Sequence, residues 1–254
     1  MSVVDRSFDD PLKLEEQGSA LLAGGIMAHG FQCGMLWGAA LAAGARAFRL
    51  FGTGPQAETA AVNAAQRLVE SFRTSNSYID CGDITEMDWR KSKGVLKFIV
   101  KGGPIKCFRM AAAYAPDAYA EIDSALSGNT FDAPSPPVSC AALFVKTAGA
   151  SEMHAVMAAG FAGGIGLSGS ACGALGAALW LTSINNIKSG DSKMDLQNSD
   201  GIDLMDRFVK SSDYEFECAA IVGRKFENVG DHSEFLRLGG CSQIIQALAE
   251  NLAS

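Results

Sequence analysis

A charge-free segment rich in glycine and alanine, with one cysteine inside it, occurs twice in the chain. Residues 160–180 have the sequence GFAGGIGLSGSACGALGAALW, and residues 21–42 have the sequence LLAGGIMAHGFQCGMLWGAALA. Aligning Cys33 with Cys172 also aligns glycines: Gly24 with Gly163, Gly25 with Gly164, Gly30 with Gly169 and Gly34 with Gly173. Small residues let backbones approach closely. We therefore expect each cysteine to lie against other backbone, in a unit that has been duplicated.

The spacing of the other cysteines supports this duplication. Cys81 follows Cys33 by 48 positions, and Cys218 follows Cys172 by 46. In each half a Gly-Gly pair begins 21 positions after the second of these cysteines. Three cysteines and two Gly-Gly pairs thus recur in the same order, as in a chain built from two related copies.

The last cysteine of each copy follows the second Gly-Gly pair. Cys241 comes directly after Gly239 and Gly240, whereas three residues separate the first-half pair from Cys107. Only the second half has a further cysteine at its start, Cys140, 32 positions before Cys172. Its counterpart in the first half would be Met1. We therefore expect the first half to lack this thiol and much of the helix that leads into the motif.

The apolar pattern predicts a mainly α fold of two tandem, related helical-bundle units with buried Gly/Ala-rich helices. Residues 56–75 have apolar positions at helical spacing, and no segment shows sustained strand alternation. The stretch 127–137, SGNTFDAPSPP, is rich in turn residues and predicts a linker. The expected domains are residues 18–126, with three cysteines, and 138–254, with four.

Shorter features complete this prediction. Residues 89–100 are expected to form a helix that ends at the first Gly-Gly pair, and the Ala115-Pro116 step is expected to interrupt the next helical run. Ser151 is a candidate N-cap. The polar residues 189–200 are expected to form an exposed loop.

Composition excludes some classes of function. The chain has 254 residues, a formal net charge of −7 and no basic stripe with aromatic residues, which argues against nucleic acid as a partner. Residues 17–45 and 154–187 are long enough and free enough of charge to span a membrane, but their glycine pairs and polar residues favour buried helices around a turn. Residues 1–17 are polar and acidic, unlike an export signal. We therefore expect a cytoplasmic protein with reduced or metal-bound thiols.

The cysteines are the candidate chemical groups. Four thiolates suit an iron–sulfur cluster or Zn²⁺, because soft sulfur ligands match these metals. The intervals in the second half, 32, 46 and 23 residues, differ from the close pairs of zinc ribbons and ferredoxins. Thiol–disulfide exchange and packing of cysteine as a small apolar residue therefore stay open as alternatives.

With these residues identified, residues 138–254 resemble the redox-active family named for its cysteine pattern, C-GCAxxG-C-C. The pattern corresponds to Cys140, to Cys172 in the sequence SACGALGA, and then to Cys218 and Cys241. The last glycine of the motif is replaced by Ala177 here. The first half resembles the family only through the repeat. The resemblance implies a small helical, redox-linked protein with an iron–sulfur or other metal centre.

Glycines beside the cysteines have a physical role in such a site. A cluster is stabilised when backbone N–H groups approach its sulfurs, and a glycine allows that approach. Gly34, Gly173, Gly239 and Gly240 are the candidates for this role.

The first half offers three thiols, Cys33, Cys81 and Cys107. Such a site could leave one metal position open or complete it with His29, four residues before Cys33, since imidazole is a common ligand. The alternative is that His29 is hydrogen-bonded at a helix turn, or that this half has lost its site. His154 and His232 are expected to lie in the first turn or cap of a helix, without a role in the site.

The sequence thus predicts a redox protein that binds an iron–sulfur centre, or Zn²⁺ as the alternative metal, through clustered cysteines. It would act as an oxidoreductase on a small-molecule substrate or exchange electrons with a partner protein. A metal-free thiol–disulfide oxidoreductase and a non-catalytic helical scaffold are the alternatives. A homodimer is compatible with the Gly/Ala-rich faces.

Overall fold

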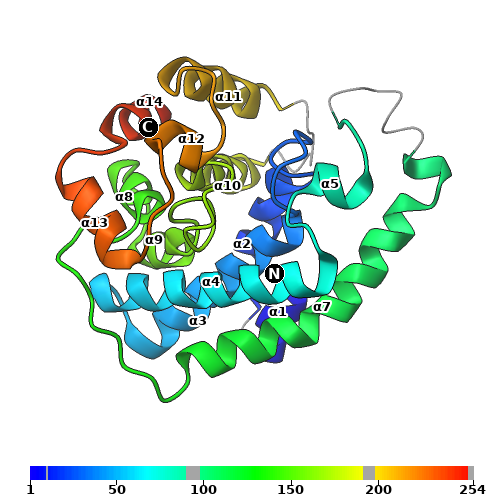
Figure 1. The fold of residues 1–254 in the computed structure, drawn as a ribbon, viewed down its shortest axis with the longest axis horizontal. Helices are drawn as coiled ribbons and strands as arrows, with labels where there is room; N and C mark the ends of the chain where they lie inside the picture. The colour runs from blue at the N-terminus through cyan, green and yellow to red at the C-terminus, as the bar shows by residue number, and fades with distance from the viewer. Residues whose placement is uncertain (10, 90–97, 191–197, 251–254) are drawn as a thin grey trace.

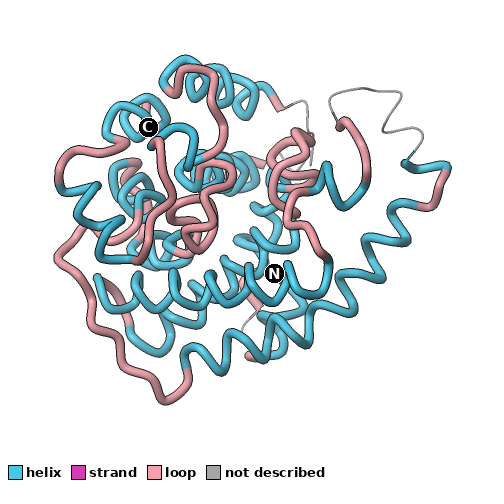
Figure 2. The backbone as a smooth tube through the Cα atoms, viewed as in Figure 1, coloured by secondary structure: helices cyan, strands magenta, loops and turns pink. Residues whose placement is uncertain are grey.

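The computed structural model describes residues 1–9, 11–89, 98–190 and 198–250 (Figure 1). Over these residues the chain forms helices and loops without a β-strand (Figure 2), so the expected mainly α class is confirmed. The helices of the first half are α1 (Ser2–Ser7), α2 (Lys13–Gly18), the 3₁₀ turn η1 (Ser19–Leu22), α3 (Gly34–Phe51), α4 (Pro55–Asn76), α5 (Cys81–Thr85) and α7 (Gly103–Leu126). Those of the second half are α8 (Cys140–Thr147), α9 (Glu152–Ala159), α10 (Gly173–Lys188), α11 (Ser199–Ser211), α12 (Cys218–Val222), α13 (Val229–Arg237) and α14 (Ser242–Ala249).

The two halves repeat the same order of helices. α1 and α2 correspond to α8 and α9, α3 corresponds to α10, and α5 corresponds to α12. The expectation that the first half lacks much of its leading helix is therefore wrong. α1 begins one residue after Met1, the position equivalent to Cys140, and is shorter than α8 by two residues. The sequence hid this helix because its residues are more polar than those of α8.

The two repeats pack on each other through equivalent elements. α3 packs against α9, and its counterpart α10 packs against α2. Such reciprocal contacts are those of a twofold-symmetric dimer, here formed within one chain. The buried side chains of Glu15 and His154, which occupy equivalent positions in the repeats, meet with 3.1 Å between Oε1 and Nε2.

A second pair of equivalent positions shows how close this packing is. Trp37 is fully buried, and its ring lies where a Cβ on Gly176 would come within 2.3 Å of it. The ring also meets Phe161 edge to face, with 4.6 Å between centroids. Glycine at 176 therefore makes the space that the tryptophan of the other repeat fills.

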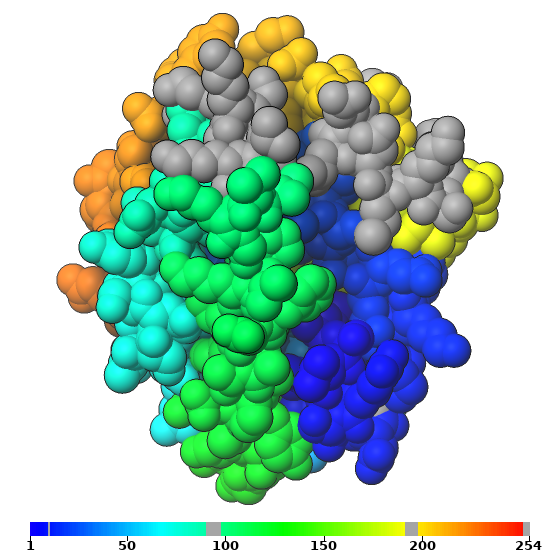
Figure 3. Space-filling view, turned by 90° about the vertical axis from the view of Figure 1, so that its right-hand side faces the viewer, coloured from blue at the N-terminus to red at the C-terminus, as the bar shows by residue number. Residues whose placement is uncertain are grey.

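Helix α7 is one continuous helix that contains Pro116, so the expected interruption at Ala115-Pro116 is wrong. A proline inside a helix removes one backbone hydrogen bond and normally bends or breaks the helix. Here Tyr114, Ala118 and Ile122 of α7 are buried and hold the segment in place. The Tyr114 hydroxyl donates a 2.7 Å hydrogen bond to the carbonyl oxygen of Leu68 in α4. Figure 3 shows α7 as a ridge between α4 and the N-terminal helices.

Other local expectations have mixed outcomes. Ser151 is the N-cap of α9, because its hydroxyl accepts a 3.2 Å hydrogen bond from the His154 N–H. The helix expected at 89–100 and the loop expected at 189–200 lie mostly outside the described residues. Among the helices that the structure describes, none is both long and apolar enough to cross a membrane.

The contact between α3 and α9 leads to a test. Gly44→Ala would place a Cβ 2.4 Å from the Met157 carbonyl oxygen, which is backbone and cannot move aside cheaply. We expect this change to lower the free energy of unfolding by about 2 kcal/mol. Urea denaturation of the reduced chain measures the effect.

Gly34→Ala in the same helix is the matched control, because its Cβ would meet its nearest atom at 3.4 Å, an ordinary contact. We expect the control to stay within about 1 kcal/mol of the parent. Equal losses in the two variants would contradict the close approach of α3 and α9.

Candidate functional site

An unusual left-handed turn precedes the motif cysteine in each repeat. Residues 24–28 and 163–167 all have positive φ, including Ile26 at 60° and Ile165 at 59°. The left-handed conformation costs roughly 1–2 kcal/mol for each non-glycine residue. Two β-branched residues at equivalent positions in this region show that the same strained turn has been kept in both copies. The glycines of residues 24–28 and 163–167 thus allow the left-handed turn, whereas the sequence led us to expect them at close contacts between backbones.

Each turn leads to a short pairing of two backbone segments that joins two cysteines. In the first repeat Cys33 N–H donates to the Ile79 carbonyl at 2.8 Å, and Cys81 N–H donates to the Phe31 carbonyl at 2.6 Å. In the second repeat the corresponding bonds run from Cys172 N–H to Phe216 at 2.9 Å and from Cys218 N–H to Ser170 at 2.7 Å. These bonds hold Cys33 beside Cys81 and Cys172 beside Cys218, although the members of the two pairs lie 48 and 46 positions apart in the sequence.

The C-terminal cysteine cluster consists of Cys140, Cys172, Cys218 and Cys241. Each of these residues stands at the start of a helix. Cys140 and Cys218 are the first residues of α8 and α12, and Cys172 and Cys241 precede α10 and α14 as N-caps. The start of a helix carries partial positive charge and N–H groups without a helical partner. Four helix starts therefore face one group of sulfurs, an arrangement that favours negative charge.

The pKa values of this cluster show that its members are near one another. Burial first, and then the charge of nearby Cys140, raise the pKa of Cys172 to about 12. Burial also raises the pKa of Cys218, and the other three thiols of the cluster raise it as well. The pKa of Cys241 is raised by burial and then by Cys140 and Cys172. Every pair in the cluster therefore interacts. Since the Coulomb energy of two charges falls with their separation, the four sulfurs lie within electrostatic range of one another.

Cys140 differs from its neighbours because it contacts a histidine. Burial raises the pKa of this thiol, but hydrogen bonding and charge from His232, with backbone N–H groups of Gly163 and Ala141, outweigh burial and lower it. His232 Nδ1 lies 2.9 Å from the Val138 carbonyl oxygen, to which it donates, and this leaves Nε2 for the sulfur. Burial lowers the pKa of His232, and the contact with Cys140 reverses that effect and raises it.

One member of the cluster is accessible from outside. Cys140, Cys172 and Cys218 are buried, whereas Cys241 is partly exposed and lines a cavity of about 450 Å³. Asp213, Glu215 and Gln243 also line this cavity. The cluster can therefore be reached at Cys241, while its other sulfurs are shielded from water.

The N-terminal cysteine cluster, Cys33, Cys81 and Cys107, repeats this arrangement with one thiol fewer. Cys33 is the N-cap of α3, Cys81 begins α5, and Cys107 lies near the start of α7. Burial, with a smaller effect of Cys107, raises the pKa of Cys33 to about 11. Burial, followed by the effects of Cys33 and Cys107, raises that of Cys81 to about 12. Burial also raises the pKa of Cys107.

In this conformation the His29 ring is held by other contacts and is not placed as a fourth ligand. Its Nδ1 lies 3.0 Å from the carbonyl oxygens of both Ile26 and Met27, and its ring stacks on Phe216 with 6.0 Å between centroids. It lines a cavity together with Trp89, outside the left-handed turn. The structure describes the hydrogen-bonded histidine at a turn that the sequence allowed, and its ligation of a metal stays a prediction.

The candidate glycines occupy different surroundings. A Cβ at Gly173 would lie 1.8 Å from the Phe161 carbonyl oxygen, so only glycine fits beside Cys172, whereas Gly34 has room for a methyl group. Gly239 has a φ of +89°, and Gly240 lies against the ring of Phe235. Gly173 therefore permits the close backbone approach expected of it, and Gly239 and Gly240 form the turn into Cys241.

The donor set suits a metal centre in chemistry and charge, since four soft thiols face four helix starts. Among the described residues, which include all seven cysteines, no group of three or more His, Cys, Asp or Glu side chains is arranged closely enough to hold a single metal ion. The described thiols are thus near one another but stand apart from the compact tetrahedron that one ion requires.

Sequence reasoning missed His232 because a helix cap explained it sufficiently. Its position between Cys218 and Cys241, inside the repeated cysteine interval, was the only signal. It also missed Asp80, whose Oδ1 accepts a 3.1 Å hydrogen bond from Ser170 Oγ across the two repeats. Burial raises the pKa of Asp80 to about 6.

Comparison with known proteins agrees with the geometry. The model of a family described as "Putative redox-active protein (C_GCAxxG_C_C)" matches residues 4–116 and, separately, residues 138–254. The first match includes α1 and α2, which correspond to α8 and α9. No curated protein and no solved structure matches the chain.

The contact between Cys140 and His232 can be tested with a double-mutant cycle on reduced, metal-free protein. We expect Cys140→Ala, His232→Gln and the double variant to give a coupling energy of about 1–3 kcal/mol near neutral pH. Because the contact lowers the pKa of Cys140, its contribution is present above that folded pKa and is lost as pH falls through it. Because the contact raises the pKa of His232, its contribution to stability is also lost as pH rises through the raised pKa of this histidine.

Urea denaturation across this pH range measures the coupling. Ser233→Ala, a change at the neighbouring buried residue, is the control and should show no coupling to Cys140→Ala. Additive losses for His232 and Cys140 at every pH would contradict the contact.

Proposed function

The chain belongs to the redox-active C_GCAxxG_C_C family, and we propose that its C-terminal cysteine cluster holds an iron–sulfur centre used in electron transfer or in reduction of a small substrate. The observation that carries this proposal is that four thiols, each at the start of a helix, lie within electrostatic range of one another. Thiolates in such positions are stabilised by the positive ends of the helices and by nearby N–H groups.

Charge and spacing support a cluster over a single ion. Burial and mutual repulsion raise the pKa values of Cys172, Cys218 and Cys241, so these thiols resist ionisation without a bound cation. A metal centre that supplies positive charge relieves this repulsion. A cluster of several irons separates its cysteine sulfurs more widely than Zn²⁺ does, and this matches thiols that are near one another without forming a single-ion site.

The chain's own residues would tune such a centre. When bound, an iron–sulfur cluster supplies reversible one-electron chemistry. Cys140, Cys172, Cys218 and Cys241 would hold it, and the close backbone at Gly173 would keep water from the Cys172 side. His232 would donate to the Cys140 sulfur, which favours the reduced form of a site by stabilising negative charge. The cavity at Cys241 gives an electron partner or small molecule its approach.

The N-terminal cysteine cluster would hold a related centre with three cysteine ligands. The position equivalent to Cys140 is Met1, so the fourth ligand would be an exogenous group, or His29 after a change of its ring orientation. A three-thiol site leaves one metal position open to a substrate. The N-terminal repeat would then carry out the reaction, and the C-terminal centre would supply it with electrons.

A metal-free thiol–disulfide oxidoreductase is the second candidate, and the Cys140–His232 contact favours it. A histidine that lowers the pKa of a thiol makes it a better nucleophile. Oxidation of Cys140 and one neighbour to a disulfide would release two electrons and two protons to a disulfide oxidant. In both candidates the protein is an oxidoreductase or electron carrier, and we propose a cytoplasmic location because the thiols must remain reduced or metal-bound.

Loading the full chain with iron and sulfide without oxygen tests the proposal. We expect equal amounts of iron and acid-labile sulfide in the protein, a brown colour, and loss of the C-terminal centre's share of both in Cys172→Ser. Cys33→Ser, at the equivalent position of the other repeat, is the matched control and should keep the C-terminal centre.

Colourless, iron-free protein after this treatment would rule out the iron–sulfur proposal. A disulfide from Cys140 to another member of its cluster, found by thiol counting and peptide mapping of the oxidised protein, would then support the second candidate. Full retention of all seven thiols on oxidation would exclude that candidate as well.

A further inference from the structure

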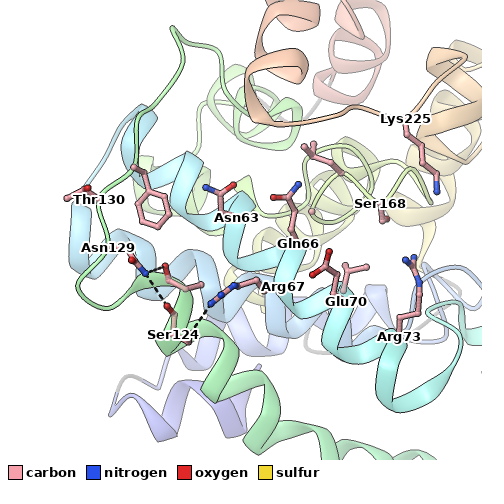
Figure 4. A pocket seen from close by; sticks show the side chains of 15 residues that line it. Asn63, Gln66, Arg67, Glu70, Arg73, Ser124, Asn129, Thr130, Ser168 and Lys225 are labelled. Atoms are coloured by element: carbon pink, nitrogen blue, oxygen red, sulfur yellow. Dashed lines mark hydrogen bonds between the residues drawn. The ribbon is translucent and has the colours of Figure 1, made fainter.

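A cavity of about 730 Å³ lies outside the C-terminal cysteine cluster (Figure 4). Its long wall is α4, and the chain that follows α7 closes one end. Ser168, which follows the left-handed turn of the second repeat, and Lys225 line the other end, while Gly166 of that turn lies against Gln66 of α4. This volume is within the range of small-molecule sites, which is roughly 300–1,000 Å³.

One end of the cavity has amide groups and an aromatic ring. Asn63 and Gln66 of α4 present their amides to the cavity, and Asn129 and Thr130 lie at the Asn63 end (Figure 4). Phe131, the residue after Thr130, also lines the cavity. The Asn129 Nδ2 group donates to the carbonyl oxygens of Ser124 at 3.1 Å and Ala125 at 2.8 Å, which fixes the side chain. Amides both donate and accept hydrogen bonds, and an aromatic ring offers a face for stacking. This end therefore suits a planar ring with polar edges.

The opposite end is cationic. Arg73, Lys225 and the Ser168 hydroxyl gather there (Figure 4). The Lys225 side chain lies across Gly169, where a Cβ would come within 2.9 Å of its Cγ and Cε atoms. Glycine at this position thus lets the lysine lie over the turn. The Ser168 hydroxyl donates its hydrogen to the Gly164 carbonyl oxygen, so the two cations are the groups at this end that would hold an anion. In a chain with a net charge of −7, two cations at one end of a cavity favour an anionic group such as a phosphate.

Between the two ends stands Glu70, the one carboxylate among the residues that line this cavity. A carboxylate accepts hydrogen bonds and suits sugar hydroxyls, whereas it repels an anion. Arg67 nearby is held by a 2.9 Å hydrogen bond from Nη1 to the Ser124 hydroxyl. Asn63 and Arg73 are ten residues apart on α4, which separates the two ends by roughly 15 Å.

We propose that this cavity binds a nucleoside phosphate, with the base between the amides and Phe131, the ribose at Glu70 and the phosphates at Arg73 and Lys225. The order of ring-binding, hydroxyl-binding and phosphate-binding groups along one wall is the observation that carries this assignment. It stands on the cavity alone and does not require a metal in the cysteine clusters.

The position of the cavity connects it to the cysteines. Gly166 and Ser168 belong to, or directly follow, the turn that contains Gly163, whose N–H lowers the pKa of Cys140. A nucleotide bound here would therefore touch the turn that supports the C-terminal cysteine cluster.

The equivalent turn in the first repeat also lines a cavity, of about 540 Å³, through His29 and Gly30. That cavity is lined by the acidic residues Asp83 and Glu86 in place of cations. The two cavities share the equivalent positions His29 and Ser168, and the cavity at Ser168 has the cations that a phosphate needs.

Isothermal titration calorimetry of the full chain with ADP tests the proposal. We expect ADP to bind more tightly than adenosine or inorganic phosphate, because only ADP engages both ends. Arg73→Gln and Lys225→Gln should each weaken ADP binding about tenfold, the effect of losing one charge-assisted contact. Arg109→Gln, an exposed arginine of α7 outside the cavity, should leave it unchanged.

Any one of four results would overturn the proposal. The first is no detectable binding of ADP, the second is equal affinity for ADP and adenosine, and the third is equal affinity for ADP and inorganic phosphate. Unchanged ADP affinity in both Arg73→Gln and Lys225→Gln would place the ligand elsewhere and would also refute it. Iron content is measured on the same variants, so that failure of this site is distinguished from failure of the metal centre.

Discussion

The backbone pairing between the motif cysteine and the following cysteine is the constraint on which the rest of each repeat depends. The bonds from Cys172 N–H to Phe216 and from Cys218 N–H to Ser170 fix two helix starts beside each other. The left-handed turn before Cys172 gives the chain the direction that this pairing needs, at a cost in backbone strain. The same bonds and the same turn recur in the first repeat, so duplication has copied the constraint together with the thiols.

The two repeats pack on each other through residues at equivalent positions. Glu15 meets His154 and Trp37 meets Gly176 at equivalent positions, as the two subunits of a dimer would meet on their axis. Symmetry then brings the two cysteine-bearing turns near each other, and Gln32 crosses between them with a 3.1 Å hydrogen bond from Nε2 to the Gly164 carbonyl. The chain is therefore a fused pair in which one copy keeps four thiols and the other keeps three.

Much of this arrangement could be predicted from residue types and spacing. The repeated interval between cysteines indicated the duplication, and the family pattern identified the four thiols of the second half. The cysteine spacing could not show that α1 is the leading helix of the first repeat, because α1 has no cysteine at its start and is more polar than α8. It could not identify His232 either, since its contact with Cys140 depends on how α13 packs on α8. The continuity of α7 through Pro116 likewise depends on tertiary packing that overrides a local preference.

The central claim is that the four buried thiols of the second repeat form one site for a multi-iron centre. Iron K-edge X-ray absorption of the oxygen-free, iron-loaded chain tests it most directly. A multi-iron centre in this site predicts a first shell made mainly of sulfur, apart from the one non-cysteine ligand of the N-terminal centre, and iron neighbours at short distance around each iron. A first shell of oxygen or nitrogen, or isolated irons without iron neighbours, would contradict it.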